Sequence, residues 1–378
     1  MKTPFKKLIA NSVVILCLVQ IFGCGSGGSG DSANEEALSL PEKIQVIDRY
    51  LYDLNEQERF NGAVLLAKEG EPVLMKTYGY TDASKESLLT IDSSFRLASV
   101  SKQFTTMAIM ILKERGLLNF SDIISQHLPE LKDNNITIEH LMHHTSGIQD
   151  YTNFPESYIT EQGAEFMTMP VFFEIIKEHP LNREFEPGSQ WKYSNTGYIL
   201  LAEIVARVSG VSFADFIHQE ISLPLAMYDT DVFNLLSDPN DGRLLNRTVG
   251  INDDQNVTMT FLDGIAGDGA VFSSIADFLK WDQALTNDTL ITAQTKSQAF
   301  TSGVLNNGSS TDYGYGWFVR TTGNNQYVSH SGGWLAARTY IRRNLTTGAV
   351  MVIFDNSQTG ELSTIFDKIT TTLEGEGF

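Results

Sequence analysis

Two-residue periodicity, which is typical of β-strands, occurs near both ends of the chain, whereas the pattern between them is mostly helical. Near the start, residues 62–68 and 73–80 predict two strands joined by a hairpin turn. After residue 314 the same periodicity returns. The strands expected there span residues 315–320, 326–330, 336–342 and 349–354. This distribution predicts one antiparallel sheet assembled from both ends of the chain.

Helical periodicity predicts the elements that flank and interrupt this sheet. Residues 39–56 and 361–373 carry apolar residues at helical spacing, and residues 101–115 are apolar on almost every face, which is typical of a buried helix. The expected fold class is therefore α+β, with a site in a cleft between its two parts. The expected domain spans residues 39–378 and has two parts. The α/β part consists of about residues 39–115 together with 300–378, and the inserted, mostly helical part of about residues 116–299.

The N-terminal segment predicts export. Residues 1–23 have a short basic start and an apolar run too short to span a bilayer, as in a cleaved signal peptide. Residues 21–24 resemble the lipobox of a bacterial lipoprotein, in which Cys24 carries the lipid anchor; the alternative is an ordinary secretory signal cleaved nearby. Residues 24–38 are then the anchor and a flexible linker. This predicts an exported lipoprotein facing the periplasm, and the lack of an acidic residue directly after Cys24 favours the outer membrane.

The composition excludes two classes of function. The chain has 46 acidic and 27 basic residues, and its formal net charge of −19 repels the phosphate backbone of nucleic acids. Both cysteines, Cys17 and Cys24, precede the expected domain, so the domain has no disulfide and no thiolate nucleophile or metal ligand. We therefore expect no nucleic-acid partner and no cysteine chemistry.

A serine and a lysine mark the start of the expected buried helix. Ser99 and Lys102 form an S-x-x-K motif, and residues three apart share one face of a helix. The motif also occurs at Ser189 and Lys192, in a polar loop, so the motif alone carries no weight. Lys102 is distinguished by being the only charged residue in the apolar segment 97–112. A lysine in such a setting loses affinity for its proton and can act as a base, which makes Ser99 a candidate nucleophile.

Two further polar segments lie far from this pair in the sequence. Tyr193 and Asn195 form a Y-x-N segment before an expected helix at 197–209, and alone they could be a packed aromatic and a helix N-cap. The sequence His-Ser-Gly-Gly at 330–333 closes an expected strand, and alone it could be a strand end followed by a glycine turn.

Together, and in this order, S-x-x-K, Y-x-N and H-x-G resemble the motifs of the penicillin-recognising serine hydrolases, which include serine β-lactamases, DD-peptidases and related esterases. The Y-x-N form is similar to the branch with class C β-lactamases, certain DD-carboxypeptidases, D-amino-acid peptidases and family VIII esterases. Segments that support the resemblance are 95–98, 141–147, 187–188, 267–274 with Asp277, and 313–317. The resemblance covers about residues 40–375 and implies the β-lactamase/transpeptidase-like fold.

The resemblance implies catalytic roles for three side chains. Ser99 matches the acylating nucleophile, and Lys102 matches the lysine that shares its proton network. Tyr193 matches the base in acylation, which is also the acid toward the leaving group. Since an unperturbed phenol titrates near ~10, Tyr193 needs a nearby cation, such as Lys102, to act as a base at neutral pH. The backbone N–H groups of Ser99 and Gly333 match the oxyanion hole.

The resemblance also implies a set of substrate contacts. The residues concerned are Asn195, His330, Ser331 and Gly332. Gly332 is expected to let substrate lie against the strand edge, where a side chain would block it. His330 departs from class C β-lactamases, which carry lysine there. Because histidine is mostly neutral at pH 7, it suits a neutral ester or peptide better than a carboxylate-bearing lactam.

Three clustered histidines do not predict a metal site. His140 and His144 have the spacing of an H-E-x-x-H motif, but Leu141 stands where that motif has its glutamate. The run 144–147 matches a structural turn of the resembled family. The sequence has no phosphate loop and no dinucleotide fingerprint, so we expect neither metal nor cofactor.

The sequence therefore predicts an exported serine hydrolase that acts through a covalent acyl-enzyme on a D-amino-acid peptide, as DD-carboxypeptidases do, or on an ester. Two alternatives stay open: a class C-like β-lactamase, and a non-catalytic peptidoglycan-peptide binder or penicillin sensor. The expected partners are a small peptide, ester or β-lactam and, through the lipid anchor, a membrane. The sequence leaves the oligomeric state open.

Overall fold

The computed structural model describes residues 38–132, 135–237, 242–358 and 361–378. Residues 39–378 belong to a single structural unit. The predicted signal peptide, the anchor Cys24 and nearly all of the linker lie outside the described residues. Among the described helices, none has both the length and the apolar character needed to cross a membrane.

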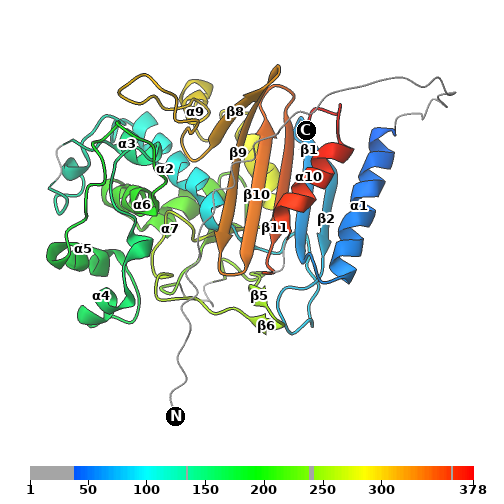
Figure 1. The fold of residues 1–378 in the computed structure, drawn as a ribbon, viewed down its shortest axis with the longest axis horizontal. Helices are drawn as coiled ribbons and strands as arrows, with labels where there is room; N and C mark the ends of the chain where they lie inside the picture. Colours follow the sequence, from blue (N-terminus) through cyan, green and yellow to red (C-terminus); the bar gives the residue numbers. More distant parts are fainter. Residues whose placement is uncertain (1–37, 133–134, 238–241, 359–360) are drawn as a thin grey trace, which may run out of the picture. The chain divides into compact units, whose positions relative to one another are not determined.

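The central element is a six-stranded sheet with the order β2-β1-β11-β10-β9-β8, in which all neighbouring strands are antiparallel (Figure 1). The bounds are β1 Gly62–Lys68, β2 Glu71–Tyr78, β8 Phe318–Thr322, β9 Asn325–Trp334, β10 Ala337–Asn344 and β11 Ala349–Asp355. Because β1 pairs with β11, strands from the two ends of the chain meet in the middle of the sheet. The predicted α+β fold with a sheet from both ends is confirmed.

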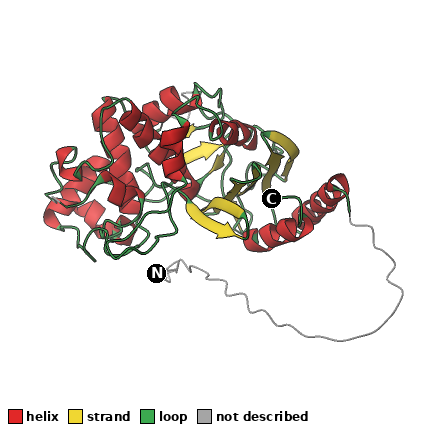
Figure 2. Ribbon diagram, turned by 90° about the horizontal axis from the view of Figure 1, so that it is seen from above, coloured by secondary structure: helices red, strands yellow, loops and turns green. Residues whose placement is uncertain are grey.

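Helices cover both faces of the sheet. They are α1 (Leu40–Glu56) and α10 (Leu362–Thr372) on one face and α8 (Ile275–Ala284) on the other. Alternate residues of β1 therefore enter different cores: Val64 and Leu66 pack with α1 and α10, whereas Leu65 packs in the larger core that contains α8. Figure 2 shows most of the remaining helices gathered to one side of the strands.

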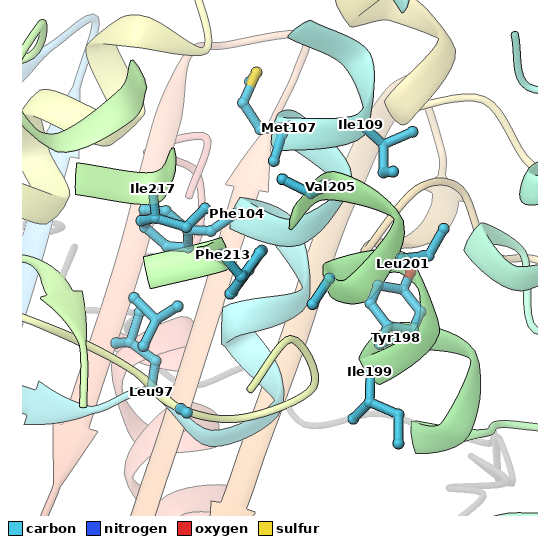
Figure 3. Close-up of a cluster of buried hydrophobic side chains, with 14 of the residues drawn as sticks. Leu97, Phe104, Met107, Ile109, Tyr198, Ile199, Leu201, Val205, Phe213 and Ile217 are labelled. Carbon is cyan, nitrogen blue, oxygen red and sulfur yellow. The ribbon is translucent and has the colours of Figure 1, made fainter. Parts of the chain in front are cut away.

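A helix buried on all sides runs through the larger core. This helix, α2 (Lys102–Glu114), packs against α6 (Asn195–Ser209), and its residues from Lys102 to Leu112 are buried. Figure 3 shows Phe104 of α2 close to Phe213 and Ile217 of α7 (Phe213–Ile217). The predicted buried helix is confirmed, but its first residues, Ala98–Ser101, form a 3₁₀ turn.

The inserted region contains short helices and two small sheets. Its other helices are α3 (Ile138–Met142), α4 (Glu156–Glu161), α5 (Met169–Glu178) and α9 (Ala293–Ala299). The small strands are β3 (Phe95–Arg96), β7 (Val271–Ser273) and β4 (Asp231–Val232) in one sheet, and β5 (Ile251–Asn252) and β6 (Gln255–Asn256) in the other. β3 leads into the turn that carries Ser99, so this small sheet fixes the start of that turn.

The prediction that a strand ends at His330 is wrong, because β9 continues to Trp334 and pairs with β10 from Tyr327 to Trp334. On its other side, β8 pairs with β9 only as far as Ser329. Residues 330–334 therefore have one edge without a strand partner among the described residues. We call this edge, from His330 to Trp334, the open edge of β9.

Candidate active site

Ser99 and Lys102 form the centre of the site. Ser99 is partly exposed, whereas its neighbours Ala98 and Val100 are buried. The side chain of Lys102 is fully buried, and its Nζ lies 3.2 Å from Ser99 Oγ. The three-residue spacing predicted from the sequence thus places the Lys102 amine within hydrogen-bond reach of the Ser99 hydroxyl. The other serine of this turn, Ser101, is buried.

The turn before Ser99 is held in an uncommon conformation. Ala98 has a φ of +47°, in the left-handed region that residues other than glycine seldom adopt. Two hydrogen bonds fix the preceding residue: the Leu97 N–H donates to Val271 O at 2.9 Å, and Thr339 Oγ1 donates to Leu97 O at 2.6 Å. The surrounding sheets therefore impose the strained backbone that orients Ser99.

The amine of Lys102 is bonded on all sides. Besides Ser99, Nζ donates to Asn195 Oδ1 at 2.9 Å and to the backbone oxygen of Asp268 at 2.8 Å. Burial lowers the pKa of Lys102 to about 8, while the charges of Asp268 and Asp150 oppose this shift. The lysine is therefore fixed in position, yet a tenth or so of it is neutral at pH 7.

Asn195 is oriented by a carboxylate that the sequence did not reveal. It was a possible N-cap, but in the structure it is the first residue of α6, and the cap position belongs to Ser194. Asp150 Oδ2 accepts hydrogen bonds from the Asn195 backbone N–H at 2.7 Å and from Nδ2 at 3.2 Å. Since the amide nitrogen faces Asp150, the amide oxygen must face Lys102.

A second hidden carboxylate, that of Asp268, lies beside Lys102. Asp268 Oδ2 accepts a hydrogen bond from the Tyr151 hydroxyl at 2.9 Å. Burial raises the pKa of Asp268, and Lys102 and Tyr151 oppose the shift. Asp150 lies outside every predicted motif, and Asp268 lies in the segment 267–274, which supported the resemblance but gave its carboxylate no role. Their partners are distant in sequence, by 45 residues for Asp150 and Asn195 and by 166 for Asp268 and Lys102, so local spacing did not reveal these contacts.

The phenol of Tyr193 also reaches the site. Lys102 Nζ lies 4.8 Å from the centre of its ring, and the ring of His144 lies 4.3 Å away on a tilted plane. The hydroxyl is buried and has no hydrogen-bond partner among the described residues. Burial raises the pKa of Tyr193 well above its usual value, although Ser99 partly opposes this shift. In this arrangement Tyr193 is a neutral phenol.

The ring of His330, a residue predicted to bind substrate, is hydrogen-bonded to protein through both of its nitrogens. It is buried, with 2% of its surface exposed, and its Nδ1 donates to the backbone oxygen of Ser331 at 2.7 Å. Nε2 is then free to accept, and the Tyr313 hydroxyl donates to it at 3.0 Å. Burial, and then the charge of Lys102, lower the pKa of His330 to about 3. The ring is therefore uncharged and both of its nitrogens are occupied.

The two glycines of β9 have different surroundings. A Cβ at Gly332 would lie 2.3 Å from both Leu97 O and Thr339 Oγ1, and 3.0 Å from the backbone nitrogen of Ser99. The packing of β9 against the turn of Ser99 thus requires a glycine at 332, and its role beside a substrate stays a prediction. A Cβ at Gly333 would meet nothing within 4 Å, and Ser331 is exposed.

The clustered histidines have separate structural roles. The backbone N–H of His140 donates to Thr137 Oγ1 at the start of α3, and His143 Nδ1 lies 2.9 Å from Tyr313 O. His144 Nδ1 accepts from the backbone N–H of Ser194 at 3.1 Å, which ties down the segment of Tyr193. Over the described parts of the chain, no group of three or more potential ligands is arranged to hold a metal ion.

Comparisons with known proteins agree with this geometry. The family model described as Beta-lactamase matches residues 47–371. Penicillin-binding protein 4* of Bacillus subtilis (strain 168) is 35% identical over 317 residues, covering 81% of this chain and 70% of that protein. A D-aminopeptidase of Brucella anthropi is 26% identical over 73% of this chain and 53% of its own length, so this chain spans about half of it.

A solved structure shows the same fold. D-amino acid amidase from Ochrobactrum anthropi SV3, complexed with L-phenylalanine amide, aligns with a TM-score of 0.70 and 21% identity, covering 89% of this chain and 99% of that chain. All four side chains that meet at the site, namely Ser99, Lys102, Tyr193 and Asn195, lie within the segment that the family model matches. The chain thus belongs to the beta-lactamase family and is a serine hydrolase of the penicillin-recognising superfamily.

Proposed function

We propose that Ser99 forms a covalent acyl-enzyme and that the substrate is a D-amino-acid peptide or an ester. The observation that carries this proposal is the 3.2 Å contact between Ser99 Oγ and the buried Lys102 Nζ, whose pKa is about 8. A buried amine with a lowered pKa can take the hydroxyl proton at neutral pH, which is what activates a serine as nucleophile.

The proton route begins at Lys102. Neutral Lys102 accepts the proton of Ser99 as Oγ bonds to the substrate carbonyl carbon and the carbonyl oxygen becomes an oxyanion. The neutral phenol of Tyr193 then protonates the departing amine or alkoxide, and Lys102 restores the proton to Tyr193. This route keeps the acid role that the resemblance gives to Tyr193 and assigns the base role to Lys102, because burial holds the proton of Tyr193 firmly. Water attacks the acyl-enzyme in the second half of the cycle.

Substrate binding along the open edge of β9 fits this route. An extended peptide adds to a free strand edge through main-chain hydrogen bonds. Gly332 lies against the backbone nitrogen of Ser99, so a carbonyl at Ser99 is next to Gly333. The N–H groups of Ser99 and Gly333 are proposed as the oxyanion hole, and exposed Ser331 as a contact to substrate.

The uncharged His330 favours a peptide or ester over a β-lactam. A class C-like β-lactamase would use a lysine cation at this position to attract the lactam carboxylate. Here the pKa of about 3 leaves His330 neutral, and Tyr313 and Ser331 occupy its nitrogens. The relatives named as a penicillin-binding protein and a D-aminopeptidase support the peptide class.

The proposal predicts a covalent adduct with a penicillin. We expect the mass of the chain from residue 33 onward to increase by one penicillin after mixing, and we expect no increase for Ser99→Ala. Intact-protein mass spectrometry measures both. The lifetime of the adduct separates the activities, because a β-lactamase loses it quickly and a peptidase keeps it.

Hydrolysis of a D-alanyl-D-alanine peptide and of a nitrophenyl ester, measured beside the mass experiment, completes the test. An adduct on both proteins would place the reactive group elsewhere than Ser99. No adduct and no hydrolysis of any of these compounds would contradict an acyl-enzyme mechanism and support a non-catalytic binder.

The pKa of Lys102 predicts the pH dependence. Since the neutral amine is the active form, kcat/KM is expected to rise about tenfold per pH unit below pH 8 and to level off above pH 9. Asp268 raises the pKa of Lys102, so Asp268→Asn is expected to move the whole profile to lower pH. Initial rates of ester hydrolysis at a series of pH values, corrected for spontaneous hydrolysis, measure this shift of the pH profile. A rate that falls as the pH passes 8 would show that the protonated lysine is the active form.

A further inference from the structure

A small cavity with an unpaired arginine lies at the Trp334 end of the open edge of β9. Its volume is about 40 Å³, enough for a small polar group such as a carboxylate. Its lining includes Arg96 and Phe272 of the small sheet, Trp334 of β9, and Arg247. Two of these residues are near the active site along the chain, because Arg96 stands three residues before Ser99 and Trp334 follows Gly333.

The charges around this cavity are unbalanced. Arg96 is paired with Asp263, whose Oδ1 also accepts from Trp334 Nε1 at 2.8 Å. The other oxygen of Asp263 accepts from the backbone N–H of Thr260 at 2.6 Å and from its hydroxyl at 3.0 Å. All four acceptor positions of the Asp263 carboxylate are therefore occupied, and none is left for a hydrogen bond from the second arginine.

Arg247 lacks any counter-ion within the described ranges. Its guanidinium carbon lies 4.1 Å from the ring centre of Phe233 and 5.6 Å from that of Phe272, and no hydrogen bond or ion pair to another described residue holds it. Burial and the charge of Arg96 lower the pKa of Arg247, although a guanidinium keeps its proton at any ordinary pH. A half-buried, unpaired cation is unusual in a chain with 46 acidic residues.

The position of Tyr193 decides which end of a substrate reaches this cavity. The ring of Tyr193 lies 6.2 Å from that of His330, at the opposite end of the open edge. The group that protonates the leaving group therefore stands at the His330 end. A substrate bound along the edge extends its acyl part toward Trp334 and the cavity.

We propose that Arg247, with Arg96 beside it, binds a carboxylate on the acyl side of the substrate, so that the preferred substrate is an acidic peptide rather than a neutral one. The guanidinium lies over the ring of Phe233, and its planar group can give a carboxylate two parallel hydrogen bonds. This inference rests on the proposed function, since it places the carboxylate relative to a carbonyl at Ser99.

The test compares acidic and neutral caps on one peptide. D-Alanyl-D-alanine acylated with succinate, glutarate or adipate is paired with the corresponding terminal amide, so that each pair differs only in the charge of the acyl part. For at least one length, kcat/KM of the acid is expected to exceed that of its amide by about tenfold. Arg247→Gln is expected to bring this ratio to about one, and Arg247→Lys to keep part of it.

A matched control removes the same charge elsewhere. Arg49→Gln on α1, where the side chain is 75% exposed, is expected to keep the wild-type ratio. A ratio near one for all three lengths in the wild type, or a ratio that Arg247→Gln does not change, would overturn the proposal. Thermal melting confirms that each variant is folded.

Binding without turnover separates this inference from the proposed function. Calorimetric titration of Ser99→Ala with each acid and amide is expected to give tighter binding of one acid, and the difference is expected to disappear in Ser99→Ala/Arg247→Gln. If the wild type hydrolyses no peptide but this difference in binding is found, the proposed activity fails and the carboxylate site stands. Equal binding of acid and amide at every length contradicts the site, whatever the activity.

Discussion

Lys102→Met is expected to lower kcat/KM by about a thousandfold, which corresponds to about 4 kcal/mol of transition-state stabilisation. Methionine fills the buried space but cannot accept the proton of Ser99, from which Lys102 Nζ is 3.2 Å distant. It also leaves Asn195 Oδ1 and Asp268 O without their donor, at a cost of about 1–3 kcal/mol in the free energy of unfolding. Steady-state kinetics well below the melting temperature measure the loss of rate separately from the loss of stability.

Lys102→Arg distinguishes a base from a fixed positive charge. Arginine keeps the charge at this position but cannot lose its proton at any pH at which the protein is folded. If the lysine acts as the base, Lys102→Arg is expected to be as inactive as Lys102→Met, and its residual rate should lose the rise toward pH 8. A variant within about tenfold of the wild type would mean that Lys102 serves as a cation and that another group takes the proton.

Gly332→Ala is expected to lower kcat/KM by about a hundredfold and the free energy of unfolding by about 1–3 kcal/mol. The added Cβ would lie 2.3 Å from both Leu97 O and Thr339 Oγ1, which are themselves hydrogen-bonded. One of these atoms must move, and both hold the turn that orients Ser99. Denaturant titration and ester hydrolysis measure the two effects.

The neighbouring glycine supplies the control. Gly333→Ala adds the same methyl group one residue along the strand, where nothing lies within 4 Å, so the free energy of unfolding is expected to change by no more than about 0.5 kcal/mol. Equal destabilisation by the two substitutions would show that β9 rejects any side chain here, and the specific contact with the turn of Ser99 would no longer explain the effect.

Features that depend on nearby residues were predictable from the sequence. Strand periodicity at both ends of the chain gave the antiparallel sheet, since alternation of side chains depends only on the local backbone. The apolar segment after Ser99 gave the buried helix α2, and three-residue spacing placed Lys102 near Ser99. The bounds were less certain: the strand expected at 315–320 is β8 at Phe318–Thr322.

Features that depend on distant residues were decided only by the tertiary structure. Asp150 and Asp268 meet Asn195 and Lys102 across long stretches of chain, and local spacing does not reveal these contacts. The sequence predicted that His330 is mostly neutral, but its pKa of about 3 and its bond to Tyr313 follow from burial by other elements. Periodicity tells which face a side chain occupies, whereas solvation and charge pairing depend on what packs against that face.

The same distinction holds for β9 and its neighbourhood. The sequence identified 330–333 as part of the site, but only the register with β8 leaves the edge from His330 to Trp334 open. Arg247 belongs to no predicted motif, and only folding placed it in one cavity with Arg96 and without an ion pair to any acidic side chain that the structure describes. The sequence by itself therefore determined the fold and the reacting pair, because both follow from local spacing. The tertiary structure decided the charge state and the recognition surface of the site, because electrostatic interactions act through space and not along the chain.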